Sequence, residues 1–162
     1  MTVTAQPVVT LSAPASVCSN ESPFTLTANP AGGNFSGTGV NASGAFDPSI
    51  GPGTYTVTYV YSQNGCTGSA QRTVVILATP NTPSILRNGD TLYTTSSGLH
   101  TWYRDGVAIN GVTDSVLIIP GPGAYTVEVA NSNGCVSPIS VPENVVSTSI
   151  VERSEPSILI YP

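Results

Sequence analysis

The chain contains no lysine and little charge of either sign. Its 162 residues include four arginines and nine carboxylates, so charged residues make up 8% of the sequence and the formal net charge is −5. Typical globular chains carry about 25% charged residues. So few cations cannot neutralise a run of phosphates, which excludes nucleic acid as a partner, and an anionic membrane surface would repel the chain.

Long apolar runs and helical periodicity are also missing. No stretch approaches the roughly 20 apolar residues of a membrane helix, so we expect no membrane insertion. No segment repeats apolar residues at helical spacing, and 16 glycines and 14 prolines interrupt the chain. Residues 1–7 show no charged-then-apolar signal pattern, and we expect any secretion signal to lie outside this sequence.

Groups that carry catalysis are scarce. His100 is the sole histidine, and neither G-x-S-x-G nor CxxC occurs. Nucleophilic triads, metal sites and calcium loops are therefore unsupported. A glycosidase needs two carboxylates about 5 to 10 Å apart in a cleft, which two small sandwiches rarely build. We expect no enzymatic activity and no bound cofactor or metal.

What the chain does contain is a duplicated segment. Gly51-Pro-Gly-Thr-Tyr-Thr-Val57 recurs as Gly121-Pro-Gly-Ala-Tyr-Thr-Val127, an offset of 121 − 51 = 70 residues, and each copy continues to an Asn-Gly-Cys. A repeat at fixed offset marks a duplicated structural unit. We expect an all-β fold of two tandem antiparallel β-sandwiches, over residues 1–78 and 79–146. They meet at the prolines of residues 78–83, and residues 147–162 form a linker.

Strand signals fill both units. β-branched and aromatic residues alternate with polar ones in Thr54–Tyr61 and Ala124–Ala130. Asn-Gly and Asp-Gly pairs between strand candidates suit hairpin turns. The shorter strand candidates are Val8–Leu11, Phe24–Ala28, Arg72–Leu77, Thr91–Thr95, Leu99–Arg104, Ser115–Ile119 and Pro138–Val141.

Three aromatic residues are candidates for the core. The Gly-x-Tyr-x-Val motif predicts that Tyr55 and Tyr125 form tyrosine corners, packed inward with the hydroxyl bonded back across the loop. Trp102 lies on a strand candidate, and we expect it at the centre of the second sandwich. The alternative is a sugar-stacking platform of Trp102 and Tyr103. Alternation along a strand puts one of these two rings inside, so both cannot line one flat face.

The three cysteines leave one without a partner. Cys18 and Cys66 both fall in the first unit, and a disulfide between them would close a loop of about 48 residues worth roughly 4 kcal/mol. Such a bond would place the chain in an oxidising, extracytoplasmic compartment. Cys135 has no partner in the second unit, so we expect a partly buried free thiol there. The alternative is an intermolecular disulfide or a reactive site.

Short motifs recur in a fixed order along both units. They are Val17–Glu21, Gly32–Gly37, Phe46–Pro48, Gly53–Val57 and Gly65-Cys66 in the first unit, and Trp102–Gly106, Ile109–Gly111, Gly123–Val127 and Asn133–Cys135 in the second. Their order resembles the PKD-like or immunoglobulin-like repeats of secreted Bacteroidetes surface proteins. The resemblance implies two immunoglobulin-like (PKD-like) sandwiches that act as spacers or adhesive stalks.

Two further patterns match the same group of proteins. Ile158–Pro162 resembles the opening of the C-terminal sorting domain of type IX secretion, which implies that residues 147–162 lead into a truncated sorting domain. Asp90-Thr-Leu92 and Asp114-Ser-Val116 fit the O-glycosylation pattern of that phylum, which implies modification of Thr91 and Ser115.

Residues and resemblance together predict a monomeric, non-catalytic spacer or adhesion segment of a secreted or surface-anchored bacterial protein. Its partner would be a surface polysaccharide or another surface protein. The alternative is a carbohydrate-binding accessory module of a secreted glycoside hydrolase, with Tyr59, Tyr61 and Tyr103 as glycan contacts on an outer face. A third interpretation is a module that accepts a strand along an open sheet edge.

Overall fold

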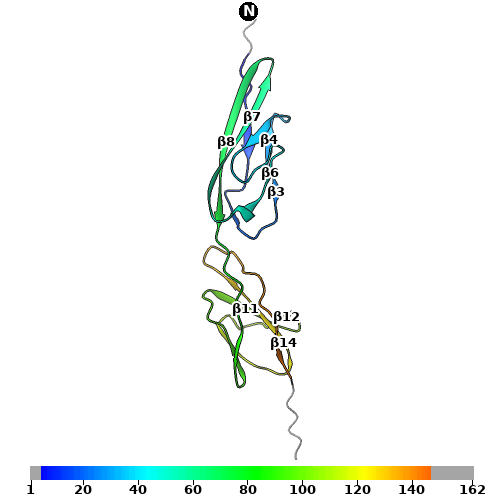
Figure 1. The fold of residues 1–162 in the computed structure, drawn as a ribbon, viewed down its shortest axis with the longest axis vertical. Helices are drawn as coiled ribbons and strands as arrows, with labels where there is room; N and C mark the ends of the chain where they lie inside the picture. Colours follow the sequence, from blue (N-terminus) through cyan, green and yellow to red (C-terminus); the bar gives the residue numbers. More distant parts are fainter. Residues whose placement is uncertain (1–4, 147–162) are drawn as a thin grey trace, which may run out of the picture.

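The computed structural model describes residues 5–146, so the predicted sorting-domain segment at 147–162 lies outside it. In the described range the chain forms strands and one turn of 3₁₀-helix, η1 (Pro48–Ile50), with no α-helix. Two sets of strands follow each other along the chain and lie end to end along the long axis (Figure 1). We call β1–β8 with their loops unit 1, and β9–β15 with their loops unit 2.

Unit 1 is built around a long antiparallel hairpin. The sheet order is β2-β8-β7-β5, and β2 runs parallel to the last residues of β8. Two short antiparallel pairs, β1-β4 and β3-β6, face this sheet. The strands are β1 (Thr10–Ser12), β2 (Ser16–Cys18), β3 (Phe24–Thr25), β4 (Thr27–Asn29), β5 (Asn34–Ser36), β6 (Ala45–Phe46), β7 (Gly53–Gln63) and β8 (Cys66–Leu77).

Unit 2 pairs a three-stranded sheet with a four-stranded one. The orders are β13-β10-β9 and β12-β11-β14-β15, and every pair is antiparallel. The strands are β9 (Leu86–Asn88), β10 (Thr91–Tyr93), β11 (Leu99–Arg104), β12 (Val107–Ala108), β13 (Val116–Ile118), β14 (Gly123–Ala130) and β15 (Glu143–Val145). The expected all-β fold of two tandem β-sandwiches is thus confirmed.

Each unit buries its own core through period-two alternation along the strands. In unit 1, Val57 and Tyr59 from β7 and Val74 from β8 pack against Phe46. The core of unit 2 is the set Leu92, Trp102, Leu117, Tyr125, Val127 and Val145. The two clusters share no residue, so each unit has a hydrophobic centre of its own.

One predicted strand is wrong. Pro138–Val141 is irregular, and β15 begins two residues later at Glu143. Two serine side chains replace the regular ladder there. Ser137 Oγ accepts from Val129 N and Ser140 Oγ accepts from Val127 N, each at 3.0 Å. A proline lies between the two serines and cannot donate to a ladder, which explains why the strand is interrupted.

Candidate functional site: the joint between the units

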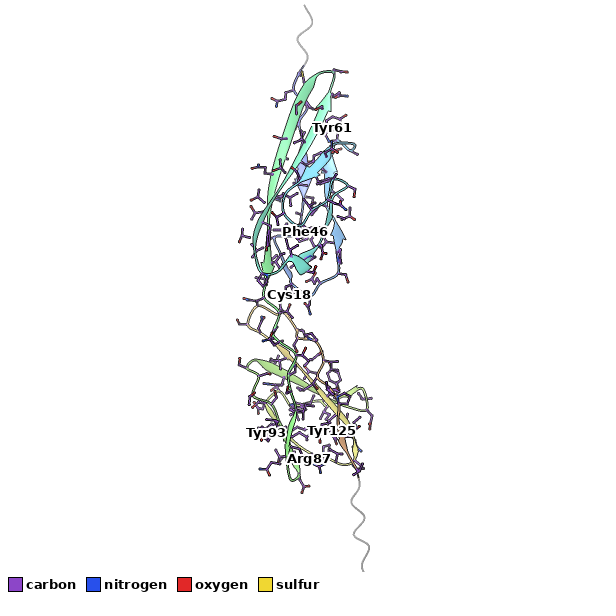
Figure 2. The ribbon with its side chains drawn as sticks, in the orientation of Figure 1. Cys18, Phe46, Tyr61, Arg87, Tyr93 and Tyr125 are labelled. Carbon is purple, nitrogen blue, oxygen red and sulfur yellow. A yellow bond between two sulfur atoms is a disulfide. The ribbon has the colours of Figure 1, made fainter. Side chains whose placement is uncertain are left out.

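A disulfide crosses the boundary between the two units. Cys18 at the end of β2 is bonded to Cys135, which follows β14, with a Cα–Cα distance of 5.7 Å across a sequence separation of 117 residues. Figure 2 shows Cys18 at the level where the two ribbons meet. Because Cys135 is bonded to Cys18, the predicted free thiol at this position is wrong, and the residue is fully buried.

The predicted Cys18–Cys66 disulfide is also wrong, and the register of β8 explains why. Cys18 pairs with Leu77 at the last position of β8, whereas Cys66 is the first residue of that strand. The two positions on β8 are 77 − 66 = 11 residues apart, or about 36 Å along an extended strand. A disulfide needs Cα atoms within about 7 Å, so Cys18 and Cys66 cannot be bridged in this fold.

Hydrogen bonds from asparagine side chains cross the same boundary in both directions. Asn20 of unit 1 donates from Nδ2 to the carbonyl of Val136 in unit 2 at 3.0 Å. Asn131 of unit 2 donates from Nδ2 to the carbonyl of Ala78, which follows β8, at 2.7 Å. The disulfide is therefore one of three direct links between the units that the structure shows among residues 5–146.

The connecting chain is held against unit 1 by hydroxyl groups. Thr79 N donates to Ser19 Oγ at 3.2 Å, and Thr79 Oγ1 donates to Asn20 Oδ1 at 3.0 Å. The two hydroxyls of Ser19 and Thr79 also bond each other at 2.9 Å, and Ser19 N donates to the Leu77 carbonyl. The first two linker residues are thus fixed in place, so they do not act as a free tether.

Asn131 links the cysteine loop of unit 2 to the linker. Its Oδ1 accepts from the backbone N–H groups of Asn133 at 3.0 Å and Cys135 at 3.1 Å, while its Nδ2 reaches the Ala78 carbonyl. One side chain therefore shapes the loop that carries Cys135 and also binds the neighbouring unit. On the unit 1 side, the backbone N–H of Cys18 donates to Glu21 Oε1 at 3.2 Å, so a carboxylate contacts the chain beside the disulfide.

The two corner tyrosines have the same geometry in both units. Tyr55 donates its hydroxyl to the Gly51 carbonyl at 3.0 Å, and Tyr125 donates to the Gly121 carbonyl at 2.6 Å. Both bonds span four residues, as the repeated motif predicts. Tyr125 is fully buried, whereas Tyr55 is half-buried against the unit 1 core. The repeat therefore encodes the same turn at the head of β7 and of β14.

Trp102 occupies the centre of unit 2. Its ring is fully buried, and Nε1 donates to the Asp114 carbonyl at 2.9 Å. That bond satisfies the indole N–H inside the sandwich.

The sole histidine, His100, is also buried, and its Nε2 lies 3.0 Å from the Ser96 carbonyl. Across residues 5–146 no group of three or more His, Cys, Asp or Glu side chains could hold a metal ion.

Two of the three proposed glycan contacts face the core of unit 1. Tyr59 is 1% exposed, donates to the Pro30 carbonyl at 2.6 Å and accepts from Gly33 N at 2.7 Å, so its predicted outer-face position is wrong. Tyr61 lies two residues further along the same strand and packs half-buried against the same core, so it does not lie on an outer face either.

Tyr103 differs from these two because it lies next to the inward-facing Trp102 and points to the opposite face. Its hydroxyl donates to Glu128 Oε1 at 2.5 Å. This hydrogen bond raises the pKa of Tyr103 above the ordinary value of 10.0, because the neutral phenol is the donor. The ring is held in one orientation on the outer face of the β11-β14 pair.

Of the two proposed O-glycosylation positions, Thr91 lies on the three-stranded sheet of unit 2 and Ser115 lies directly beside it. Thr91 begins β10, and Ser115 precedes β13. Both side chains are half-buried, and the Ser115 carbonyl accepts from Thr94 N at 2.9 Å. Their modification stays a prediction.

Within the part of the chain that the structure covers, no helix has the length and apolar character needed to span a membrane.

Comparison with known proteins leaves the family open. A family model described as the sperm-tail PG-rich repeat matches residues 119–141, the segment with the Pro-Gly corner and β14. That match covers well under half of the chain. Comparison with curated proteins gives no match.

A solved structure of the four N-terminal Ig domains of Dscam1 isoform 9.44 aligns at 14% identity and a TM-score of 0.30. The alignment covers 86% of this chain and 47% of that one, so this chain spans about half the length of the solved chain. At this TM-score the likeness carries no argument about function.

Proposed function

We propose that this chain is a non-catalytic extracellular spacer whose two immunoglobulin-like units are locked end to end into one stiff rod. The observation that carries the proposal is the joint, where a disulfide and two asparagine hydrogen bonds tie the units together. A pair of freely hinged domains would need none of these links. A spacer that must hold a functional domain at a fixed distance needs all of its length to be rigid.

The disulfide also supports an extracytoplasmic location. Disulfides persist in oxidising compartments and are reduced in the cytosol. The surface chemistry of the chain fits the same setting, because its polar surface comes mainly from Thr, Ser, Asn and Gly in place of charged residues. Secretion through the type IX route, and anchoring at a bacterial surface, belong to the same proposal and rest on the resemblance of the motifs.

Small-angle X-ray scattering of the oxidised chain tests the spacer. The expected result is a pair-distance distribution of an elongated rod that is unchanged between 20 °C and 40 °C. The matched comparison is the Cys18→Ala/Cys135→Ala variant with Asn20→Ala and Asn131→Ala added. It should show a broader distribution, because the units can then reorient about the linker. A compact particle from the oxidised wild-type chain would overturn the proposal.

A carbohydrate-binding module remains a second candidate because of Tyr103. The hydrogen bond to Glu128 fixes the ring on an outer face, and a pre-oriented aromatic ring loses little entropy when a sugar stacks on it. Polysaccharide pull-down with the wild type and Tyr103→Ala decides between the two functions. Micromolar binding that the substitution abolishes would favour the carbohydrate module, and no binding by either protein leaves the spacer.

A further inference from the structure

β8 is paired along most of its length on one side and only at its end on the other. β7 pairs with residues 66–76 of this strand, whereas β2 pairs with residues 75–77 alone. β8 runs along unit 1 from the hairpin tip to the joint (Figure 1). The side of β8 that is turned away from β7 is therefore a sheet edge over most of the unit.

Two contacts show which backbone groups of β8 point toward this edge. Val75 N donates to the Ala15 carbonyl at 3.0 Å, and the Thr67 carbonyl accepts from the Gln6 side-chain amide at 2.8 Å. Both β8 residues are odd-numbered, and the direction of the backbone groups alternates along a strand, so the odd-numbered residues between them point the same way. Within residues 5–146 the backbone groups of these intervening residues form no hydrogen bond toward the edge, and the residues are Ser69, Gln71 and Thr73.

The chain leaves this stretch of edge uncovered because it changes sheets here. β1 pairs with β4 in one sheet and β2 pairs with β8 in the other, so residues 13–15 cross between them. Pro14, in the middle of the crossing, has no N–H to donate to a ladder. Beside the crossing lies a hollow of about 430 Å³, lined by Ala13, Ala15, Thr56, Gln71, Arg72 and Thr73.

Arg72 places a cation without a partner beside the open edge. It has the same parity along β8 as the buried Val74, yet its side chain is exposed, so the sandwich is open at this point. Arg87 and Arg104 each donate to a backbone carbonyl, whereas Arg72 makes no hydrogen bond or ion pair with any residue in the described part of the chain. None of the residues that line the hollow is acidic. The charge of Arg72 is therefore available to an acidic group from outside.

We propose that the edge of β8 at residues 69–73 is a docking site for an extended peptide segment of another protein, with an acidic side chain that pairs with Arg72. The unpaired backbone groups would continue the ladder into the added strand, which is recognition by β-strand addition. Gln6 and Ala15 occupy the edge on either side, so the added strand is short, about 17 Å long. The inference goes beyond the spacer, because it gives the side of the rod a partner.

Hydrogen exchange of the oxidised chain tests the open edge. The amides of Gln71 and Thr73 should exchange much faster than those of Arg72 and Val74, whose N–H groups point to β7. Equal protection of the two sets would show that the edge is already paired, and it would overturn the proposal.

Titration with the peptide acetyl-Thr-Val-Glu-Val-Thr-amide, followed by amide NMR shifts, tests the partner. The peptide reads the same in both directions, so its glutamate is central in either orientation. At up to about 5 mM peptide, we expect shifts and slowed exchange at the amides of Ser69, Gln71 and Thr73. Their absence in the wild type would overturn the proposal.

Two substitutions at one position separate the backbone from the side chain. Gln71→Pro removes an N–H that points to the edge and leaves the β7 ladder intact, so it should weaken peptide binding about tenfold. Gln71→Ala loses the side-chain bond to Thr58 but keeps the N–H, and binding should persist. Equal affinities of the two variants would contradict strand addition.

Arg72→Gln tests the acidic side chain of the partner. The substitution should weaken binding about two- to fivefold, as expected for an exposed ion pair. Replacing the peptide glutamate by glutamine should give the same loss, and the two changes together should give no further loss. Charges that point inward also protect sheet edges from pairing, so tighter or unchanged binding by Arg72→Gln would overturn the proposal. In every variant the Cys18–Cys135 bond and the unit 2 spectrum report folding, and no outcome alters the scattering test of the spacer.

Discussion

Removal of the disulfide by Cys18→Ala/Cys135→Ala should destabilise both units at once. The bond closes a sequence separation of 117 residues. In the chain-entropy model, a loop of that length stabilises the folded state by about 5 kcal/mol at 25 °C. Native domains are stable by roughly 5–15 kcal/mol, so this single bond accounts for a large part of the total.

Coupling between the units follows from the position of the loop. The loop divides at Ala78 into segments of 78 − 18 = 60 and 135 − 78 = 57 residues. If one unit unfolds while the other stays folded, the unfolded segment is still tied at both ends. Each segment alone is worth about 4 kcal/mol in the same model. The bond therefore stabilises each unit separately, although it lies in neither core.

Calorimetry and urea unfolding measure the effect. The midpoint of thermal unfolding should fall by roughly 10–20 °C in the double variant, given 2–4 °C per kcal/mol for a chain of this size. Wild-type protein reduced with dithiothreitol keeps both sulfur atoms and separates the loss of the bond from the cavity left at buried Cys135. The reduced wild-type protein should show most of this decrease in the unfolding midpoint, and the Cys66→Ala control should show little of it. A decrease below about 3 °C in both the double variant and the reduced wild type would refute the reasoning.

Three smaller perturbations test other contacts. Tyr125→Phe should cost about 1–3 kcal/mol by urea unfolding, because it removes the hydroxyl of a fully buried residue and leaves the half-buried Gly121 carbonyl without this donor, whereas Tyr55→Phe, where the tyrosine itself is half-buried, should cost about 0.5–1.5 kcal/mol. Equal costs would count against the difference in burial. Asn131→Asp keeps the side-chain oxygen that accepts from the loop of unit 2 but loses the amide that donates to the linker. With the disulfide intact, the amide chemical shifts of unit 2 should therefore stay as in the wild type while the joint loosens. Loss of the unit 2 spectrum would contradict this division of roles. Because the pKa of Tyr103 is raised by Glu128, the stabilisation from this bond is complete below the ordinary tyrosine pKa and is lost as pH rises through the folded pKa. Ultraviolet titration should show the Tyr103 pKa falling toward its ordinary value in Glu128→Ala, which removes the acceptor, and an unchanged pKa would exclude the hydrogen bond as the cause.

The sequence predicts those features that local residue patterns determine. Tyr55 and Tyr125 form the expected corners because a glycine and a tyrosine four residues apart along the chain are enough to build one. Trp102 is buried because alternation fixes its face. The first half of β8 was not expected, since Cys66–Gln71 carries few β-branched residues. Full-length pairing with β7 imposes the strand there.

The joint could not be predicted from either unit taken alone. Cys18 and Cys66 belong to one unit but lie at its opposite ends, and Cys135 reaches Cys18 only because the units are stacked head to tail. A signal for this was present in the repeat. Cys66 and Cys135 follow the same motif in their units, and in a head-to-tail pair only Cys135 lies at the boundary with unit 1, next to the end that carries Cys18. The stacking itself comes from contacts of single side chains, such as Asn20 and Asn131, which leave no pattern in the sequence.

Backbone ¹⁵N relaxation in solution tests the locked joint most directly. If the units form one rod, the T1/T2 ratios of amides in unit 1 and unit 2 fit a single axially symmetric diffusion tensor. Its long axis then runs along both units. After the Cys18→Ala/Cys135→Ala and Asn20→Ala/Asn131→Ala substitutions, the two units should require separate tensors with shorter correlation times. Separate tensors in the oxidised wild-type chain would contradict the account.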